Sequence, residues 1–194
     1  KKRTGDSGNN NWFVYHDDVI TAGGSNKSFL TLNETGAKGT NGSATTFTST
    51  SNTTFGVGTD DIISESSHTF IAYCFAEIKG YSKFGIYKGN NDNGGPFIYT
   101  GFKPAFVIIK RTDSADDWKM VSRKVEVHNT MNQSVKANSS VAEATESDHA
   151  MDLLSNGFKF RENNAAFNTS GTYVYMAWAQ EPFVTSEGLP TTAL

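Results

Sequence analysis

A nine-residue segment occurs twice in this chain, and the repeat constrains the fold more than any other feature. Residues 69–77 spell TFIAYCFAE and residues 172–180 spell TYVYMAWAQ, at an offset of 103. Aromatic residues align with aromatic residues and small residues with small ones, as at Cys74 and Ala177. A repeat at this spacing predicts two copies of one domain-sized unit.

Further matches extend the repeat toward the N-terminus. They are Phe55 with Phe158 at an offset of 103, Trp12 with Trp118 at 106, and Lys2-Arg3-Thr4 with Lys110-Arg111-Thr112 at 108. The drift from 108 to 103 requires only short insertions or deletions in turns, where they are tolerated.

The second copy is expected to begin well before Lys110. Strand-like segments at 84–87, 97–99 and 105–109 precede that residue, and the first copy has no counterpart to them. We therefore expect an incomplete first copy, whose missing strands come from preceding sequence or from a neighbouring chain, because an unpaired sheet edge would otherwise be exposed. The predicted organisation is an incomplete β-sandwich repeat at 1–80, a complete repeat at 81–183, and a C-terminal tail or linker at 184–194.

Composition and local pattern favour short strands joined by polar turns. Gly, Ser, Thr and Asn are abundant and lower helix propensity, while the 37% of apolar residues suffices for a core. Residues 70–78 and 105–109 are apolar on both faces, which is typical of central strands covered on both sides. The predicted fold class is all-β, an antiparallel β-sandwich in tandem repeat.

The connecting segments carry weaker signals. Asn90–Gly95 is a turn cluster that predicts a hairpin or a longer loop. Residues 36–54 are rich in Gly, Thr and Ser and predict an extended surface loop or a weak edge strand. Residues 140–143 have the capping-box pattern and predict one or two helical turns.

Charge and hydropathy exclude several functional classes. The net charge is −3 and the charges are scattered, so the clustered basic face that nucleic acid requires is not predicted. No apolar run approaches the ~18 residues of a membrane span, and no secretory signal follows Lys1-Lys2-Arg3. Cys74, the single cysteine, permits no disulfide framework or Cys-based zinc site within one chain and is expected to be buried.

Glycoside hydrolysis is the main catalytic alternative, because it needs two carboxylates across a cleft. The candidate acids are Asp17, Asp18, Glu143, Glu146, Asp148 and Asp152. They do not form a tight Glu-x-Asp-x-x-Glu pattern and are expected to be solvated loop charges, although carboxylates brought together from distant loops remain an alternative.

No cofactor or metal is predicted. The histidines are His16, His68, His128 and His149, and no two of them have metal-ligand spacing. His16-Asp17-Asp18 is an alternative cation site, but strand-end polar residues explain it more simply. Trp12, Trp118 and Trp178 are candidates for stacking on sugars, yet a repeated tryptophan more often serves packing, so we expect all three in the core.

Several phrases together match a known pattern. They are FIAYCFAE at 70–77, GYSKFG at 80–85, GPFIYTGFKPAFVIIKRT at 95–112, LLSNGFK at 153–159 and EPFVTSEGLP at 181–190. They resemble repeated domains in tail-fibre proteins of marine bacteriophages, particularly cyanophages. The resemblance implies a concanavalin A-like or SPRY-like β-sandwich in a virion appendage, and it transfers no catalytic or ligand-binding residue.

The expected function is therefore structural and non-enzymatic. We expect a bacteriophage tail-fibre segment, a homotrimer in contact with other virion tail proteins, that binds host-surface polysaccharide or protein through loops on a rigid scaffold. Several copies would add avidity. The expected location is the virion tail appendage, extracellular when functioning, with no nucleic-acid partner and no membrane insertion. The alternatives are a depolymerase of host polysaccharide and a capsid-mounted fibre or decoration protein.

Overall fold

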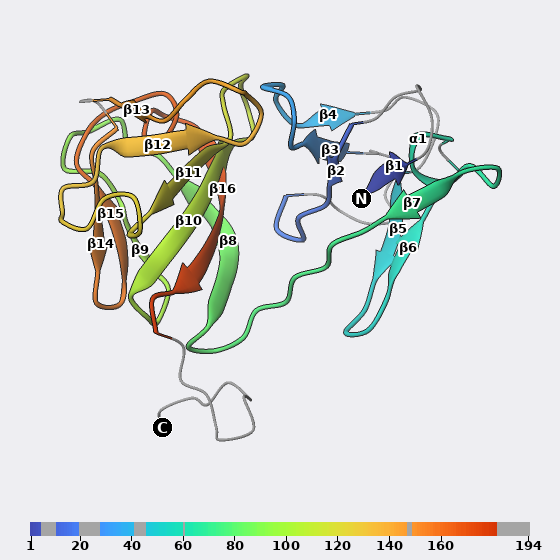
Figure 1. Ribbon diagram of the computed structural model, residues 1–194, viewed down its shortest axis with the longest axis horizontal. Helices are drawn as coiled ribbons and strands as arrows, with labels where there is room; N and C mark the ends of the chain where they lie inside the picture. The colour runs from blue at the N-terminus through green and yellow to red at the C-terminus, as the bar shows by residue number, and fades with distance from the viewer. Residues whose placement is uncertain (5–10, 20–27, 41–45, 60, 147–148, 182–194) are drawn as a thin grey trace. The chain divides into compact units, whose positions relative to one another are not determined.

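The computed structural model describes residues 1–4, 11–19, 28–40, 46–59, 61–146 and 149–181 (Figure 1). The chain divides into two compact units, unit 1 (Lys1–Cys74) and unit 2 (Phe75–Leu194). All strand pairs are antiparallel, and the described residues contain a single short helix, α1 (Asp61–Ser64). The predicted all-β antiparallel class is confirmed. The predicted tail at 184–194 lies outside the described residues.

Unit 2 is built from two antiparallel sheets. The six-stranded sheet has the order β13-β12-β11-β10-β16-β8, and the three-stranded sheet has the order β14-β15-β9. The strands are β8 (Ser82–Lys88), β9 (Phe97–Tyr99), β10 (Pro104–Arg111), β11 (Lys119–Ser122), β12 (Gln133–Lys136), β13 (Ala144–Thr145), β14 (Met151–Leu154), β15 (Gly157–Phe160) and β16 (Thr172–Ala179).

The core of unit 2 lies between these two sheets. Val107 and Ile109 of β10 belong to the same buried cluster as Leu153 of β14 and Phe158 of β15. Burial of this apolar area drives the sheets together at roughly 25 cal/mol per Å². Unit 2 is thus an antiparallel β-sandwich.

Most of the strand predictions for unit 2 are confirmed. The segments at 84–87, 97–99 and 105–109 lie in β8, β9 and β10, and Pro104 begins β10, where a missing N–H is tolerated. The cluster Asn90–Gly95 forms a longer loop between the two sheets, because β8 pairs with β16 whereas β9 pairs with β15.

The predicted helix at 140–143 is wrong. These residues adopt no helix and lead directly into β13, which pairs with β12. A short extended edge strand leaves no room for a helical turn, so the capping-box pattern is overridden by sheet pairing.

Unit 1 consists of small antiparallel sheets around a separate core. Its sheets are β1-β7, β2-β3-β4 and β5-β6, and its strands are β1 (Lys2–Thr4), β2 (Phe13–Val14), β3 (Ser28–Thr31), β4 (Gly39–Thr40), β5 (Phe47–Thr50), β6 (Phe55–Val57) and β7 (Thr69–Ile71). Phe13, Phe47 and Ile63 form the buried centre. Residues 36–54, for which an extended surface loop or a weak edge strand was predicted, contain the strands β4 and β5, and 41–45 lie outside the described residues.

The predicted central strand at 70–78 is the main error. Only β7 is a strand there, and it pairs with β1 alone among the described residues. Tyr73 and Phe75 are each 64% exposed, and Cys74, expected in the core, is exposed. An apolar alternation specifies a covered strand only where neighbouring strands and a second layer exist to cover it.

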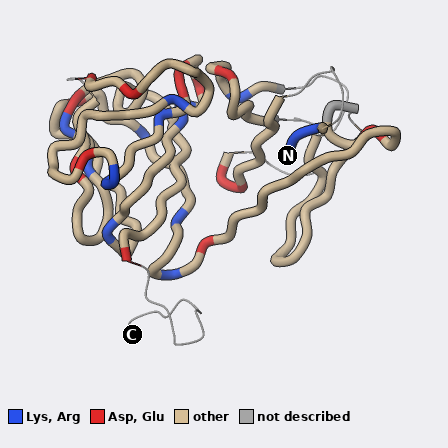
Figure 2. Tube along the Cα trace, in the orientation of Figure 1, with Lys and Arg blue, Asp and Glu red and all other residues tan. Residues whose placement is uncertain are grey.

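Acidic and basic residues are interspersed along the described chain (Figure 2). No helix in the described part of the chain is long and apolar enough to cross a membrane.

Candidate binding site

The outer face of the six-stranded sheet, opposite the core, is apolar. Along β10, Val107 and Ile109 are buried in the core, so the alternate residues Phe106 and Ile108 point to the other face. The pairing register places Phe106 beside Trp178, and Ile108 between Met120 and Met176. We call this surface the outer sheet face; its members on β8, β16, β10 and β11 are Phe84, Ile86, Phe106, Ile108, Met120, Met176 and Trp178.

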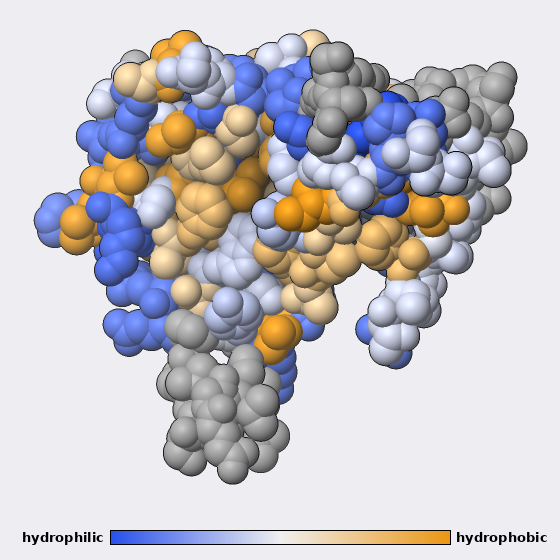
Figure 3. Space-filling view, turned by 45° about the vertical axis from the view of Figure 1, so that its right-hand side comes forward, coloured by the Kyte–Doolittle hydropathy of each residue, from blue (hydrophilic) through white to orange (hydrophobic). Residues whose placement is uncertain are grey.

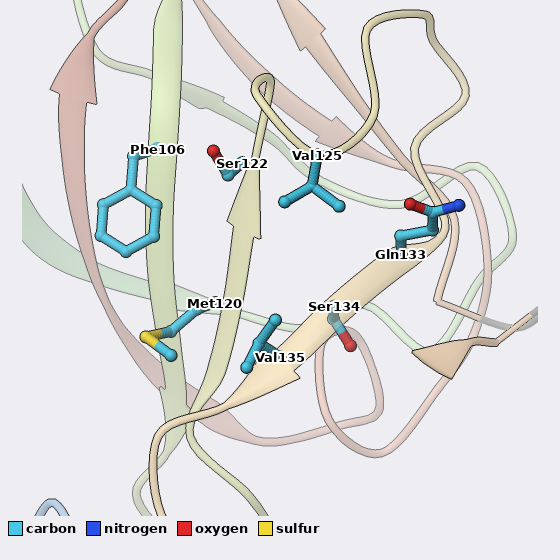
Figure 4. A pocket seen from close by; sticks show the side chains of 7 residues that line it. All are labelled: Phe106, Met120, Ser122, Val125, Gln133, Ser134 and Val135. Atoms are coloured by element: carbon cyan, nitrogen blue, oxygen red, sulfur yellow. The ribbon is translucent and has the colours of Figure 1, made fainter. Parts of the chain in front are cut away.

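A groove of about 240 Å³ lies on this face (Figure 4). It is lined by Phe106, Met120, Ser122, Val125, Gln133, Ser134 and Val135. Met120 and Val135 are register partners on neighbouring strands. The hydroxyl of Ser122 accepts a hydrogen bond of 3.2 Å from the backbone N–H of Lys124, so part of its polar capacity is used within the chain. Figure 3 shows apolar residues, in orange, among hydrophilic ones on the visible surface of unit 2.

Trp178 belongs to the outer sheet face and is only half-buried, so its predicted core position is wrong. Its ring stacks on Phe106 with centroids 5.5 Å apart and meets Phe84 and Phe75 edge-on. The side chain of Trp118, in contrast, is fully buried, as predicted. Trp12 is half-buried, and its ring stacks on Tyr73 at 5.6 Å.

The chemistry of the outer sheet face suits a protein partner better than a sugar. Aromatic and methionine side chains are enriched at the centres of protein interfaces, where charged residues are depleted. Sugar recognition requires several convergent hydrogen-bonding groups, and the groove offers few of them. The outer sheet face therefore has the composition of a protein-contact surface more than that of a sugar-binding one.

A polar hollow of about 280 Å³ lies where three chain segments meet at the end of β8 and the start of β16. It is lined by Lys88, Gly89, Asp113, Ser170, Gly171 and Thr172. The carboxylate of Asp113 accepts hydrogen bonds from Arg111 Nε at 2.8 Å and from the backbone N–H of Thr172 at 3.2 Å. The hollow is held in shape by these bonds and exposes the ammonium of Lys88 and the hydroxyl of Ser170.

A buried charged cluster connects β11 to the segment before β14. Lys119 is only 2% exposed, and its ammonium donates a hydrogen bond of 2.8 Å to Glu146 Oε2. His149 Nδ1 contacts the same oxygen. Burial, aided by the charge of Lys119, lowers the pKa of His149 to about 4. The imidazole is therefore neutral at pH 7.

The other predicted acids are dispersed. Asp152 is bound by Arg161, whose Nε donates to the carboxylate at 2.6 Å, and Asp17 accepts a hydrogen bond of 2.8 Å from the Tyr15 hydroxyl. Glu143 is exposed. Asp148 lies outside the described residues. Within unit 2, Glu146 and Asp152 are thus each paired with a cation of their own.

The histidines lie in different surroundings. His68 contacts Glu65 at 3.2 Å and also the guanidinium of Arg3, His128 is exposed and His16 is half-buried. Among the residues that the structure describes, no group of three or more His, Cys, Asp or Glu side chains is arranged to hold a metal ion.

Fold and surface together define an all-β protein with a sandwich unit that carries an apolar sheet face and a separate polar hollow. The chain belongs to the family described as a domain of unknown function, DUF7483, whose model matches residues 1–182 and so spans both units. Comparison with curated proteins and with solved structures finds no match.

Proposed function

We propose that this chain is a structural and host-attachment segment of a bacteriophage tail fibre. The observation that carries the proposal is the separation of two surfaces on one sandwich: an apolar sheet face suited to assembly and a polar hollow formed by loops. The sequence resemblance to marine phage tail fibres supports the same role. In this role the chain works without catalysis, outside the cell, as part of the virion tail appendage.

The occupant that we propose for the outer sheet face is a second copy of this chain, within a homotrimer. Phe106 and Trp178 are stacked and half-buried there, and aromatic anchors of this kind dominate the binding free energy of interfaces. A fibre contains identical copies at high local concentration, which favours a self-complementary or cyclic contact over a foreign partner.

Replacing Met120 with glutamate is expected to dissociate the trimer. The carboxylate would be placed in the lining of the groove, where a charge that is buried by the partner and left unpaired costs several kcal/mol. Sedimentation velocity of the full chain measures the mass. Tyr99→Glu is the matched control, because Tyr99 is 64% exposed on β9 in the other sheet. A monomeric native chain, or equal dissociation by both variants, would contradict assembly through this face.

The polar hollow is proposed as the attachment surface for host polysaccharide or protein. Charge reversal by Lys88→Glu is expected to weaken binding of host-surface polysaccharide by about tenfold. The substitution replaces a favourable contact of the ammonium with polar groups of the ligand by a carboxylate of opposite charge. Binding of fluorescent chain to host cells, and to their purified polysaccharide, provides the measurement. Lys124→Glu reverses an exposed charge on the loop after β11 and should leave binding unchanged. Equal loss with both variants would indicate a general charge effect instead.

The same polysaccharide distinguishes attachment from depolymerisation. An attachment protein leaves the polymer intact, whereas a depolymerase releases new reducing ends during incubation. Labelling the chain in an intact particle distinguishes a tail position from a capsid position.

A further inference from the structure

We infer that unit 1 and unit 2 are two copies of one fold, and that the described strands of unit 1 leave an acceptor edge at β1 and β7. The occupant that fits this edge is a strand segment of the kind formed by β8, β9 and the first half of β10, supplied by another repeat of the same sequence type. This inference does not depend on the proposed role in a virion.

The first support is the pairing of β1 with β7, which repeats the pairing of β10 with β16. Arg3 pairs with Phe70, and Arg111 pairs with Tyr173, which are the residues aligned by the sequence repeat. The hydrogen bonds that end these ladders also match. The hydroxyl of the threonine after each arginine donates to the backbone oxygen of the partner strand's threonine, at 3.2 Å in unit 1 and 3.0 Å in unit 2.

The second support is a hydrogen-bonded corner at each aligned tryptophan. The backbone N–H of Trp12 donates to Asn33 Oδ1 at 2.7 Å, and that of Trp118 donates to Asn138 Oδ1 at 2.7 Å. In both units the asparagine amide then donates, at 2.8 Å, to the side chain of the residue before the tryptophan. A side-chain bridge of this kind depends on both backbone register and residue identity, so its recurrence indicates a shared local fold.

Further strand pairs agree in register across the remaining sheets. Each strand pair of unit 1 has an aligned pair in unit 2: Val14–Leu30 matches Met120–Val135, Phe29–Gly39 matches Ser134–Ala144, and Thr50–Phe55 matches Leu153–Phe158. The backbones of Lys1 and Phe13 exchange hydrogen bonds of 2.9 and 2.7 Å, as expected for counterparts of the paired residues Ile109 and Lys119. Lys1 therefore occupies the position of Ile109, in the middle of the strand equivalent to β10.

The correspondence identifies which neighbours are missing from the described part of unit 1. In unit 2, Ala177 is fully buried, and its strand is paired with β10 on one side and β8 on the other. Its counterpart in unit 1 is Cys74, which is exposed. Residues 72–74 carry the small and aromatic pattern of a covered strand, yet none of the described strands pairs with them.

The chemistry of the occupant follows from unit 2. In that unit, Ser82–Lys88 pairs antiparallel along one edge of β16, and the first half of β10 pairs along its other edge. Unpaired strand edges bind extended chain through backbone hydrogen bonds, while alternate side chains set specificity. The acceptor edge of unit 1 therefore selects another β8–β10 segment over an arbitrary peptide.

The test uses the full chain extended at its N-terminus. A second copy of residues 81–108 is fused directly before Lys1, which stands in the place of Ile109. The readout is the reaction rate of Cys74, the only thiol in the natural chain, with a disulfide reagent. The inference predicts that the Cys74 thiol reacts about tenfold more slowly in the extended chain than in the natural chain. The reason is that the reagent reaches the thiol only after local opening of a paired strand.

A matched extension carries Lys83→Pro and Ile108→Pro in the fused copy only, because the ladder alternation places the N–H groups of these two residues toward the strand aligned with the Cys74 segment. It should restore the fast reaction. An unchanged rate with the intact extension, or equal protection by both extensions, would overturn the inference. If the extended chain fails to fold, a synthetic peptide of residues 81–109 is mixed with the natural chain, and a thiol rate that stays unchanged at saturating peptide overturns it equally.

Discussion

Replacing Phe158 with alanine is expected to lower the free energy of unfolding of unit 2 by about 3–5 kcal/mol. Phe158 is fully buried between the two sheets. Its ring contacts Phe160 and Tyr175 edge-on, with centroids 5.7 and 5.4 Å apart. Removing it loses the transfer free energy of the ring and leaves a cavity that two paired sheets close only in part.

The aligned residue in unit 1 provides the control. Phe55 is 37% exposed, so Phe55→Ala should cost less than about 1 kcal/mol. Amide hydrogen exchange of β10 and β16 measures the opening free energy of unit 2 separately from unit 1. Equal losses from the two substitutions, or an unchanged exchange rate with Phe158→Ala, would show that the ring of Phe158 is not a central part of the core.

Local sequence patterns correctly predicted the strands of unit 2 that are covered by other parts of the same unit. The segments of β8 and β10 show the expected apolar positions next to Gly and Pro signals, and both are strands. Trp118 was correctly assigned to the core. At these positions the local residue pattern and the sheet pairing favour the same structure, so one sequence is sufficient to predict it.

The errors occur where burial depends on a partner that the local sequence does not specify. Residues 72–77 have the composition of a covered strand but are exposed, because strand pairing on this stretch ends at Ile71 among the described residues. The outer sheet face shows the converse. Trp178 was expected in the core, whereas Trp178 and its neighbour on the same face, Met176, are only half-buried. An apolar sheet face predicts that another layer covers it, but it does not identify the segment or molecule that forms this layer.

The charged groups within the sandwich could not be predicted from local sequence. Lys110 is fully buried, and its ammonium donates a hydrogen bond of 3.0 Å to the backbone oxygen of Asp116. Burial lowers the pKa of this lysine to about 8. Lys119 and Asp152 are also buried, and their ionic partners come from other segments of the chain. Lysine and aspartate are usually exposed, so their burial here reflects tertiary contacts that residue spacing does not reveal.

Lowering the pH from 6.5 to about 4 is expected to destabilise unit 2 by about 3 kcal/mol through His149 alone. The pKa of His149 lies near 4 in the folded chain, against about 6.5 in an unfolded chain. Between these values the unfolded state binds more protons, so stability rises with pH across this window and is independent of His149 above it. The cause is burial first, then the positive charges of Lys119 and Lys136, which together outweigh Asn164 and Asp117.

The comparison of natural chain with His149→Gln isolates this contribution. Glutamine retains hydrogen-bonding capacity near Glu146 and has no proton to gain, so urea unfolding of the variant should lack the pH dependence between about 4.5 and 6.5. Any loss of stability in acid that does not involve His149 persists in both proteins. The same slope in both proteins would mean that His149 is already charged in the fold. The contact between its Nδ1 and Glu146 would then outweigh burial and the ammonium of Lys119.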